Sequence, residues 1–171
     1  MDFVNAVKEV KIRRNDVMTL YDVVNLYPSI PVDVAIKLVR QWLTSCKAPV
    51  PCIDMHVDLT QLCMAQNFFF FRAKVCKQRY GTAMGNSLSS FIAEIFMAHF
   101  ETHISKDHRF PRVWIRYIDD VFAVLNKPTL DWINSLNESI NFTHEIEQDI
   151  VLPFLAIKVI NNNCKLETDI C

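Results

Sequence analysis

A chain of 171 residues with 51% hydrophobic side chains is long enough to bury a core and short enough to form one domain over residues 1–171. Its longest run without charge, residues 80–93, is too short to cross a bilayer, and its N-terminus lacks the order of a signal peptide. We therefore expect an intracellular protein, nuclear or cytoplasmic, without membrane contact. The net charge of −1 is unlike that of a free-standing nucleic-acid binder, so any such role must depend on local patches.

Two basic patches are visible along the chain. The first covers residues 8–14, and the second covers residues 72–79 directly after the aromatic run from Phe68 to Phe71. Taken alone, each patch is better explained as an ordinary solvated edge.

An alternating apolar pattern predicts the first strand over residues 16–27. The side chains expected on one face of this strand are Met18, Leu20, Asp22, Val24 and Leu26. Asp22 is thus a single charge within an apolar stripe.

Helical spacing of apolar residues predicts three helices in the middle of the chain. The first starts at Pro31 and ends before Pro49, the second covers residues 58–67, and the third is capped by residue 86 or 87 and runs to about Thr102. Residues 68–77 are predicted to form a strand before the third helix. The side chains expected inward are Val32, Ile36, Val39 and Leu43, then Leu59, Leu62 and Cys63, then Leu88, Phe91, Ile92, Ile95 and Phe96.

The C-terminal part is predicted to be mostly strand. Residues 112–118 and 121–125 form a hairpin that turns at the aspartate pair, a helix capped by Thr129 buries Leu130, Ile133 and Leu136, and strands follow over residues 141–148 and 151–160. Together the elements describe an α+β fold with helices packed on one face of a mostly antiparallel sheet. The other face is expected to be open for a ligand.

Two adjacent carboxylates, Asp119 and Asp120, lie between two apolar strands and need an explanation. They lose hydration and repel one another unless a cation neutralises them. Oxygen ligands with several charges suit Mg²⁺, and with Asp22 as a third carboxylate they could hold two ions about 4 Å apart for phosphoryl transfer. From these residues alone, a polar turn with Asp22 on an outer edge stays open as an alternative.

The only two glycines of the chain, Gly81 and Gly85, lie just before the third predicted helix. Glycine is suited to positions where the backbone must bend or where a ligand approaches it closely. An ordinary turn at a helix start is the alternative.

Histidine and cysteine give a weaker signal. His99 and His103 are spaced as zinc ligands on a helix would be, but no further ligand is close in sequence, so one helix face is the plainer interpretation. The six cysteines are scattered among apolar residues and are expected to be reduced thiols.

Four stretches of the chain, taken in order, resemble the palm of a reverse transcriptase, in detail that of Penelope-like retroelements. They are YDVVNLYPSIP, GTAMGNSLSSFIAEIFMAHFE, RYIDDVFAVL and FTHEIEQDIVLPFLAIKVI. The resemblance extends over nearly all of residues 16–160. It implies a polymerase palm that copies an RNA template: the 3′-hydroxyl of a DNA primer attacks the α-phosphate of a deoxynucleoside triphosphate, and pyrophosphate leaves.

The resemblance also implies roles for single residues. Asp22, Asp119 and Asp120 are the implied catalytic residues, and with the carbonyl of Val23 they would hold two Mg²⁺ ions, with Mn²⁺ as an alternative. The implied nucleotide-binding residues are Tyr27, Met84 and Gly85, with Tyr27 stacking under the sugar and excluding a 2′-hydroxyl. The implied template–primer contacts are Gly81, Tyr117, Leu152, Phe154 and Leu155.

Some positions depart from the usual reverse-transcriptase pattern. Met84 replaces a common glutamine, although methionine is familiar in the Penelope-like group, and Asn86, Ser90, Cys76 and Ala156 also differ. Only 21 residues precede Asp22 and only about ten follow the last predicted strand, so fingers and thumb are expected to be largely absent and the isolated chain to have little activity. A non-catalytic retroelement remnant that binds nucleic acid or protein is the main alternative, and a two-metal phosphohydrolase is a third that does not account for Tyr27.

Overall fold

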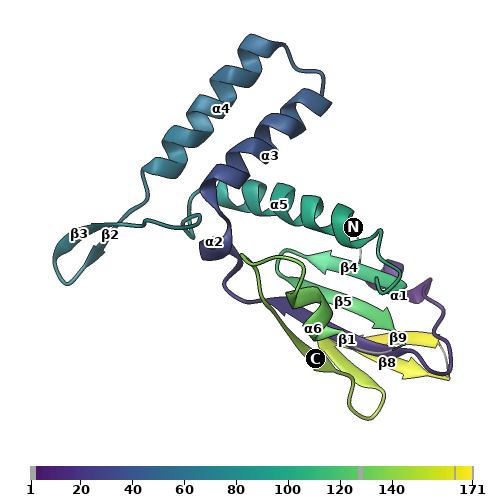
Figure 1. The fold of residues 1–171 in the computed structure, drawn as a ribbon. Coiled ribbons are helices and arrows are strands. Elements are labelled where there is room, and N and C mark those ends of the chain that lie inside the picture. Colours follow the sequence, from purple (N-terminus) through teal and green to yellow (C-terminus); the bar gives the residue numbers. More distant parts are fainter. Residues whose placement is uncertain (1–2, 127–128, 164, 171) are drawn as a thin grey trace. The chain divides into compact units, whose positions relative to one another are not determined.

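The computed structural model describes residues 3–126, 129–163 and 165–170. The chain divides into two compact units, which we call the sheet unit (residues 1–24 and 108–171) and the helical unit (residues 25–107) (Figure 1). Each unit has its own secondary structure and its own buried residues.

The sheet unit contains a four-stranded antiparallel sheet in the order β4-β5-β1-β6 and a three-stranded sheet in the order β7-β8-β9. β1 is a central strand, because it pairs with β5 on one side and with β6 on the other. The bounds are α1 Phe3–Lys8, β1 Val17–Val23, β4 Val113–Tyr117, β5 Asp120–Leu125, α6 Leu130–Asn134, β6 Phe142–Ile146, β7 Val151–Phe154, β8 Ile157–Asn162 and β9 Lys165–Ile170.

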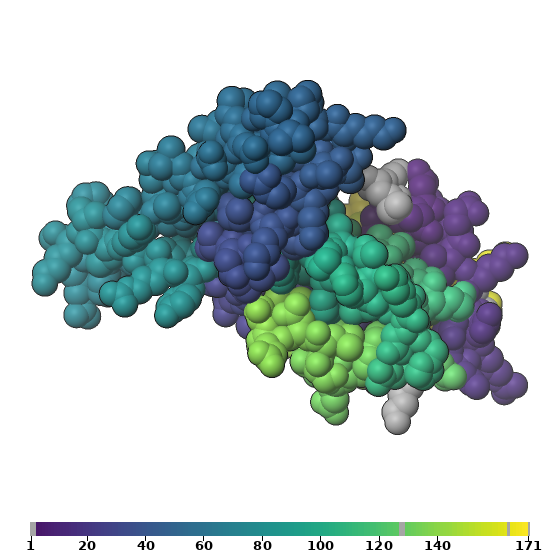
Figure 2. Space-filling model, turned by 45° about the horizontal axis from the view of Figure 1, so that its top comes forward, coloured from purple at the N-terminus to yellow at the C-terminus, as the bar shows by residue number. Residues whose placement is uncertain are grey.

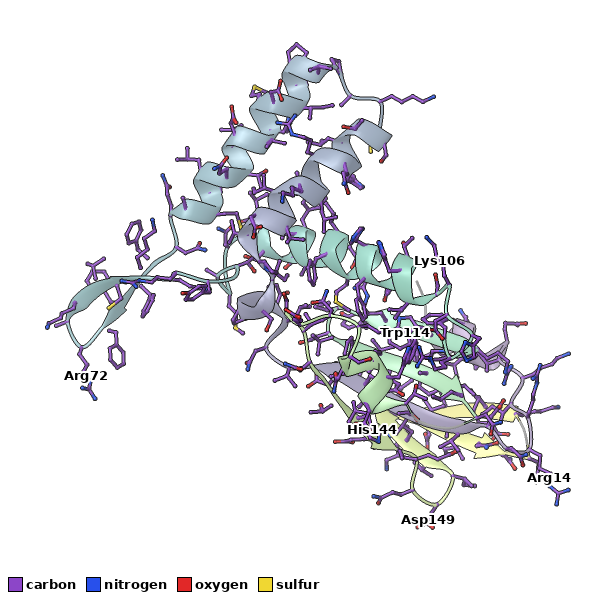
Figure 3. All side chains as sticks on the ribbon, in the orientation of Figure 1. Arg14, Arg72, Lys106, Trp114, His144 and Asp149 are labelled. Carbon is purple, nitrogen blue, oxygen red and sulfur yellow. The ribbon has the colours of Figure 1, made fainter. Side chains whose placement is uncertain are left out.

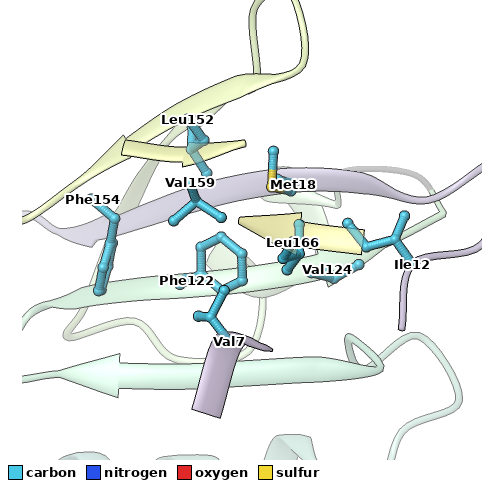
Figure 4. Packing of buried hydrophobic residues seen from close by; sticks show 9 residues of the cluster. All are labelled: Val7, Ile12, Met18, Phe122, Val124, Leu152, Phe154, Val159 and Leu166. Carbon is cyan, nitrogen blue, oxygen red and sulfur yellow. The ribbon is translucent and has the colours of Figure 1, made fainter. Parts of the chain in front are cut away.

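The main core of this unit lies between its two sheets (Figure 4). Met18 of β1 and Phe122 of β5 are fully buried, and Phe154 of β7 packs against Phe122 with ring centroids 6.0 Å apart. The ring of Phe3 from α1 also contacts both phenylalanines. The face that carries Met18 is therefore covered by the second sheet and by α1.

The opposite face of β1 is also buried, which corrects the expectation of an open sheet face. Thr19, Tyr21 and Val23 are each at most 2% exposed. The Tyr21 hydroxyl accepts a hydrogen bond from the backbone N–H of Thr129, at the start of α6. Along β1, the expectation of an open face is wrong except near the end of the strand, where Asp22 is partly exposed.

The helical unit contains four helices and one hairpin within its described residues. α3 packs against both α4 and α5. The bounds are α2 Leu26–Ser29, α3 Val32–Ser45, α4 Val50–Ala65, β2 Phe68–Phe71, β3 Lys74–Lys77 and α5 Ser89–Ile104.

The second helix differs most from its prediction. α4 begins directly after Pro49 and includes Pro51 in its first turn, where a missing backbone N–H costs nothing because that group has no helical partner. The buried side chains are Ile53, Val57, Thr60 and Met64, spaced along one stripe. The prediction that Leu59, Leu62 and Cys63 point inward is wrong: all three are exposed.

Three predicted strands end earlier than expected, because the chain turns without glycine. The backbone has positive φ at Asn25 after β1, at Arg72 and Ala73 between β2 and β3, and at Leu155 between β7 and β8. Residues 68–77 therefore form a hairpin rather than one strand, and residues 151–160 form a second hairpin, which β9 extends. Two-residue turns with positive φ usually carry Asn-Gly or Asp-Gly, so Arg-Ala gave no signal.

The remaining helices follow their predictions more closely. α5 begins at Ser89, and the side-chain oxygen of Asn86 accepts a hydrogen bond from the backbone N–H of Leu88 at 3.0 Å, just before the helix. In α6, Trp132 and Ile133 are buried, whereas Leu136 lies beyond the helix and is exposed, which corrects its assignment as inward.

Two further expectations concern thiols and membranes. Cys46, Cys52, Cys63 and Cys76 are free thiols, while Cys164 and Cys171 lie outside the described residues. In the described part of the chain, every helix is too short or too polar to cross a membrane.

Two phenylalanines offer a matched test of the core. Replacing Phe122 by alanine leaves a cavity between the two sheets, so we expect the free energy of unfolding to fall by about 3–5 kcal/mol. Replacing Phe70, which is 79% exposed, should change it by less than about 0.5 kcal/mol. Urea denaturation followed by circular dichroism measures both, and similar losses for the two variants would contradict the described core.

Candidate functional site

The aspartate pair lies at the turn between β4 and β5, but the turn is not Asp-Asp. Tyr117 pairs with Asp120, so the two turn residues are Ile118 and Asp119, and Asp120 belongs to β5. Ile118 has a φ of 60°, a conformation that β-branched residues rarely adopt. Such strain persists only where the surroundings enforce it. Ile150, in the turn before β7, has a similar φ of 66°, so the strain does not by itself indicate a functional site.

Asp120 lies directly opposite Asp22 of β1 in the antiparallel register. Directly opposed residues project from the same face of a sheet, with their Cβ atoms about 5 Å apart. The row continues to Tyr117 on β4 and Thr143 on β6. We call these four residues the cross-strand row. Side chains two and four residues apart on a strand share a face, so Asp22 lies on the same face of β1 as Met18. The row therefore lies at one end of this face, whose middle is covered by the second sheet.

Backbone hydrogen bonds hold the backbone of Asp119 beside this row. The Val23 backbone N–H donates to the Asp119 carbonyl oxygen at 3.1 Å, and the Val24 N–H donates to the Asn141 carbonyl oxygen at 2.8 Å. The turn is thereby attached to the end of β1, which brings Asp22, Asp119 and Asp120 together. The side chain of Val23 is buried, so only its backbone could contact a ligand.

The carboxylates in this region disfavour one another's charge. Burial, then Asp119 and then Glu145 raise the pKa of Asp22 above its ordinary value. Burial, then Asp119 and then Asp22 raise the pKa of Asp120. Both aspartates are therefore harder to ionise than free aspartate, and a positive charge placed beside them would relieve this cost.

The donor set suits a hard divalent cation but is not a closed cage. Three neighbouring carboxylates supply only oxygen, as Mg²⁺ prefers. Among the residues described, however, no group of three His, Cys, Asp or Glu side chains already converges as a metal site. The same finding removes support from a zinc site at His99, although its backbone carbonyl does bond to Nδ1 of His103 at 2.9 Å.

The nucleotide-binding residues implied by the resemblance lie in the helical unit. The Tyr27 carbonyl oxygen accepts hydrogen bonds from the Thr82 backbone N–H at 2.8 Å and from its hydroxyl at 3.3 Å. The Tyr27 hydroxyl lies 3.5 Å from the Ser90 hydroxyl. These bonds attach α2 to the loop before α5, so the position of Tyr27 is fixed relative to this loop.

The two glycines of this loop meet different structural requirements. A Cβ on Gly81 would lie 2.2–2.4 Å from backbone atoms of Pro28, so the close approach there is to the chain itself. Gly85 has a φ of +90° and nothing within 4 Å of where its Cβ would be. Gly85 and the neighbouring Met84, which is 71% exposed, are thus the open part of the loop.

The template–primer residues implied at the β7–β8 hairpin are mostly internal. Leu152 and Phe154 are 1% exposed and belong to the core between the sheets, so their side chains cannot contact a nucleic acid. Leu155, at the turn, is 48% exposed. Of the three, only Leu155 presents its side chain to solvent.

Two residues beside the aspartates are absent from the sequence-based set. Thr143 completes the cross-strand row, and Glu145 raises the pKa of Asp22. Both lie on β6, and the sequence alone shows that they are two residues apart on a strand and so share one face. The pairing of β6 with β1 was not, because register between distant strands has no local signal.

The glycines give a test of this loop. Gly81→Ala forces a Cβ into the Pro28 backbone and should destabilise the protein by more than about 3 kcal/mol. Gly85→Ala meets only the backbone cost of positive φ and should lose about 1–2 kcal/mol. Thermal unfolding of both variants measures the difference, and equal losses would show that Gly81 is not packed against Pro28.

The raised pKa values predict how stability depends on pH. The folded-state pKa of Asp22 lies above its ordinary value of 3.8, so the folded state binds more protons between these two values and stability falls as pH rises through the raised pKa. Asp22→Asn removes this cost, so at pH 7 the variant should be more stable than the wild type by up to about 1 kcal/mol, after solvent screening. The difference should vanish below about pH 3.8.

Urea denaturation at several pH values measures this dependence. Asp149→Asn is the matched control, because it removes the same charge from an exposed turn of the same unit, at a φ of 48° that asparagine tolerates. A variant Asp22→Asn that is less stable than wild type at pH 7 would contradict the repulsion.

Comparison with known proteins finds a similarity of structure only. No protein-family model and no curated protein matches the sequence. Apo telomerase from Candida tropicalis, truncated from its C-terminal domain, superposes with a TM-score of 0.62 at 10% identity, covering 90% of this chain and 35% of that one. Telomerase from Candida albicans, in complex with a TWJ fragment of telomeric RNA, superposes with a TM-score of 0.65 at 11% identity, covering 98% of this chain and 32% of that one.

The chain thus spans about a third of the length of these two structures. At such low identity the likeness shows the fold alone. Telomerase is a reverse-transcriptase-related enzyme, so the chain has, at a coarse level, a reverse-transcriptase-like fold of helices and antiparallel sheet.

Proposed function

We propose that this chain is the catalytic palm of an RNA-directed DNA polymerase from a Penelope-like retroelement, acting on an RNA template, a DNA primer and deoxynucleoside triphosphates. The observation that carries the proposal is the pairing of Asp22 with Asp120, beside Asp119, at the end of two central strands. The reverse-transcriptase-like fold supports it.

In this proposal Asp22, Asp119 and Asp120, with the carbonyl of Val23, hold two Mg²⁺ ions, or Mn²⁺ in their place. The bound ions would activate the primer hydroxyl and stabilise the charge on the leaving pyrophosphate. The carboxylates contribute by position: the strand register fixes Asp22 and Asp120, and the strained turn at Ile118 fixes Asp119. Their mutual repulsion favours binding of a cation over remaining bare.

The other proposed roles follow the resemblance and the exposure of each residue. Tyr27 contacts the sugar of the incoming nucleotide, while Met84 and the open backbone at Gly85 contact the nucleotide itself. Tyr117, which is 57% exposed, and Leu155 contact the template–primer duplex. Gly81, Leu152 and Phe154 do not contact the duplex with their side chains. They contribute to template–primer binding by fixing the conformation of the backbone around them.

Efficient synthesis is proposed to need more polypeptide than this chain. The chain covers about a third of each telomerase structure, and the fingers and thumb of a polymerase supply contacts to the triphosphate and to the duplex. We therefore expect the isolated chain to extend primers slowly at best.

A second candidate function is a non-catalytic module that binds nucleic acid or protein. It is favoured by the finding that, in the part of the chain described, no three metal-binding side chains already converge. The two candidates differ in whether a divalent cation binds at the aspartates.

Metal binding is the first test of the proposal. Millimolar MgCl₂ or MnCl₂ should raise the melting temperature of the wild type by a few degrees, because a ligand that binds only the folded state stabilises it. Asp22→Asn and Asp120→Asn should lose most of this increase, whereas the control Asp149→Asn should keep it. Equal increases in all four proteins would show that the cation binds elsewhere.

The same variants decide the catalytic role in a primer-extension assay on an RNA template. We expect weak, Mg²⁺-dependent addition of nucleotides by the wild type and by Asp149→Asn, and at least about a 100-fold loss in Asp119→Asn, since Asp119 would help to hold the ions that stabilise the negative charge of the transition state. Extension that survives Asp119→Asn would end the proposal. Metal-induced stabilisation that is absent from the wild type would favour the non-catalytic module.

A further inference from the structure

The β2–β3 hairpin of the helical unit exposes four consecutive phenylalanines. Their exposed fractions are 59% for Phe68, 50% for Phe69, 79% for Phe70 and 57% for Phe71. The hairpin projects from the end of α4, with Arg72 at its tip (Figures 1 and 3), and it forms the teal lobe at one end of the helical unit in Figure 2. An isolated two-stranded hairpin is marginally stable in water, so an apolar hairpin of this kind is expected to have a binding partner.

Both faces of the hairpin combine rings with cations. The register places Phe68 opposite Lys77 and Phe70 opposite Val75, which gives one face. The other face carries Phe69 opposite Cys76 and Phe71 opposite Lys74. The Lys77 ammonium lies 5.7 Å from the ring centroid of Phe68, and the Arg72 guanidinium carbon lies 5.2 Å from that of Phe71.

The charge of this segment is strongly one-sided. Residues 59–93 contain no aspartate or glutamate, although the whole chain has 19 acidic and 18 basic residues. The cations of this stretch are Arg72, Lys74, Lys77 and Arg79, all in or next to the hairpin. Four cations without acidic residues nearby in sequence indicate a polyanionic partner.

A cavity adjoins the base of the hairpin within the same unit. Its volume is about 590 Å³, and Phe68, Phe69, Arg79, Tyr80 and Met84 are among the residues that line it. Tyr80 is 81% exposed, so an aromatic ring stands at the rim of the cavity. Rings and cations therefore continue from the hairpin to a recess large enough for a small ligand.

We propose that the β2–β3 hairpin is a binding site for single-stranded nucleic acid. Bases stack on Phe69, Phe70, Phe71 and Tyr80, while Arg72, Lys74, Lys77 and Arg79 bind phosphates; stacking rings beside cations are how proteins bind single strands without sequence preference. The site goes beyond the proposed function, because it requires neither the aspartates nor a metal ion.

Two other partners fit the hairpin less well. Lysine is depleted from protein–protein interfaces, yet lysines lie on both faces here. A membrane-surface element separates its apolar face from its cationic face, whereas each face of this hairpin carries both kinds of side chain. A strand with alternating bases and phosphates matches the mixture on both faces.

Binding of labelled 15-mers of uridine (RNA) and thymidine (DNA) to the full chain tests the proposal. Fluorescence anisotropy in EDTA at low salt reports the affinity. Phe70→Ser should weaken binding about tenfold through lost stacking. Lys74→Glu should weaken it by at least as much and reduce the slope of log K against log salt by about one.

Matched controls come from the same unit. Leu62→Ser removes an apolar side chain that is 54% exposed on α4, and Lys37→Glu makes the same charge change on an exposed face of α3. Both should bind within about twofold of the wild type, since neither residue lies on the hairpin. Melting temperatures of all four variants, compared with wild type, establish that they are folded.

Each outcome decides for or against the site. Tighter binding of RNA or of DNA supports it and names the preferred strand. Equal affinities of the hairpin variants and the controls overturn it, as does a lack of oligonucleotide binding. In the latter case, binding to phosphatidylserine vesicles, or self-association that Phe70→Ser abolishes, would identify a different partner. Binding of the 15-mers is measured in EDTA and needs no metal ion, so failure of the metal tests and failure of this site are distinguishable.

Discussion

The buried core of the sheet unit holds two like charges opposite one another. Asp22 and Asp120 are direct cross-strand partners, and like charges in such positions are destabilising. A pair of this kind persists only where the rest of the sheet over-determines the register. A register shifted by one residue would turn every side chain of β1 to the other face, which would remove Met18 from the core between the sheets and place Asp22 on the side where Tyr21 is buried. The buried core thus fixes where the carboxylates lie.

The packing next to the aspartates explains how that register is enforced. Phe122 lies two residues from Asp120 on the same face, is fully buried, and contacts Phe154 of the second sheet. The hairpin that carries Phe154 ends in the exposed Leu155, so one element both closes the core and presents a side chain to solvent. On the other face, Tyr21 is buried beside Asp22 in sequence and is bonded to the start of α6. Apolar contacts on both faces of β1 offset the repulsion at its end.

How much the sequence predicted depended on whether the signal was local. The alternation around Asp22 and the apolar strands around Asp120 predicted β1, β4 and β5, and the helical spacing from Val32 predicted α3. The turn at Arg72 and Ala73 was missed because neither residue is typical of positive φ. The buried face of α4 was assigned wrongly because the helix carries apolar residues on all sides. The spacing of its apolar residues therefore does not identify one buried face. The coverage of the β1 face and the place of Thr143 depend on pairings between distant strands, which no short stretch encodes.

The net charge of −1 hides two regions of opposite sign. The carboxylates of Asp22, Asp119 and Asp120 gather at the end of central strands, where burial and repulsion raise the pKa of two of them. Residues 59–93 carry only positive charge, next to exposed aromatic rings. An overall balance near zero argues against nucleic-acid binding only when charges are evenly mixed. Here three acids lie where a cation is proposed to bind and four cations lie where phosphates are proposed to bind, so the near-neutral total does not argue against either site.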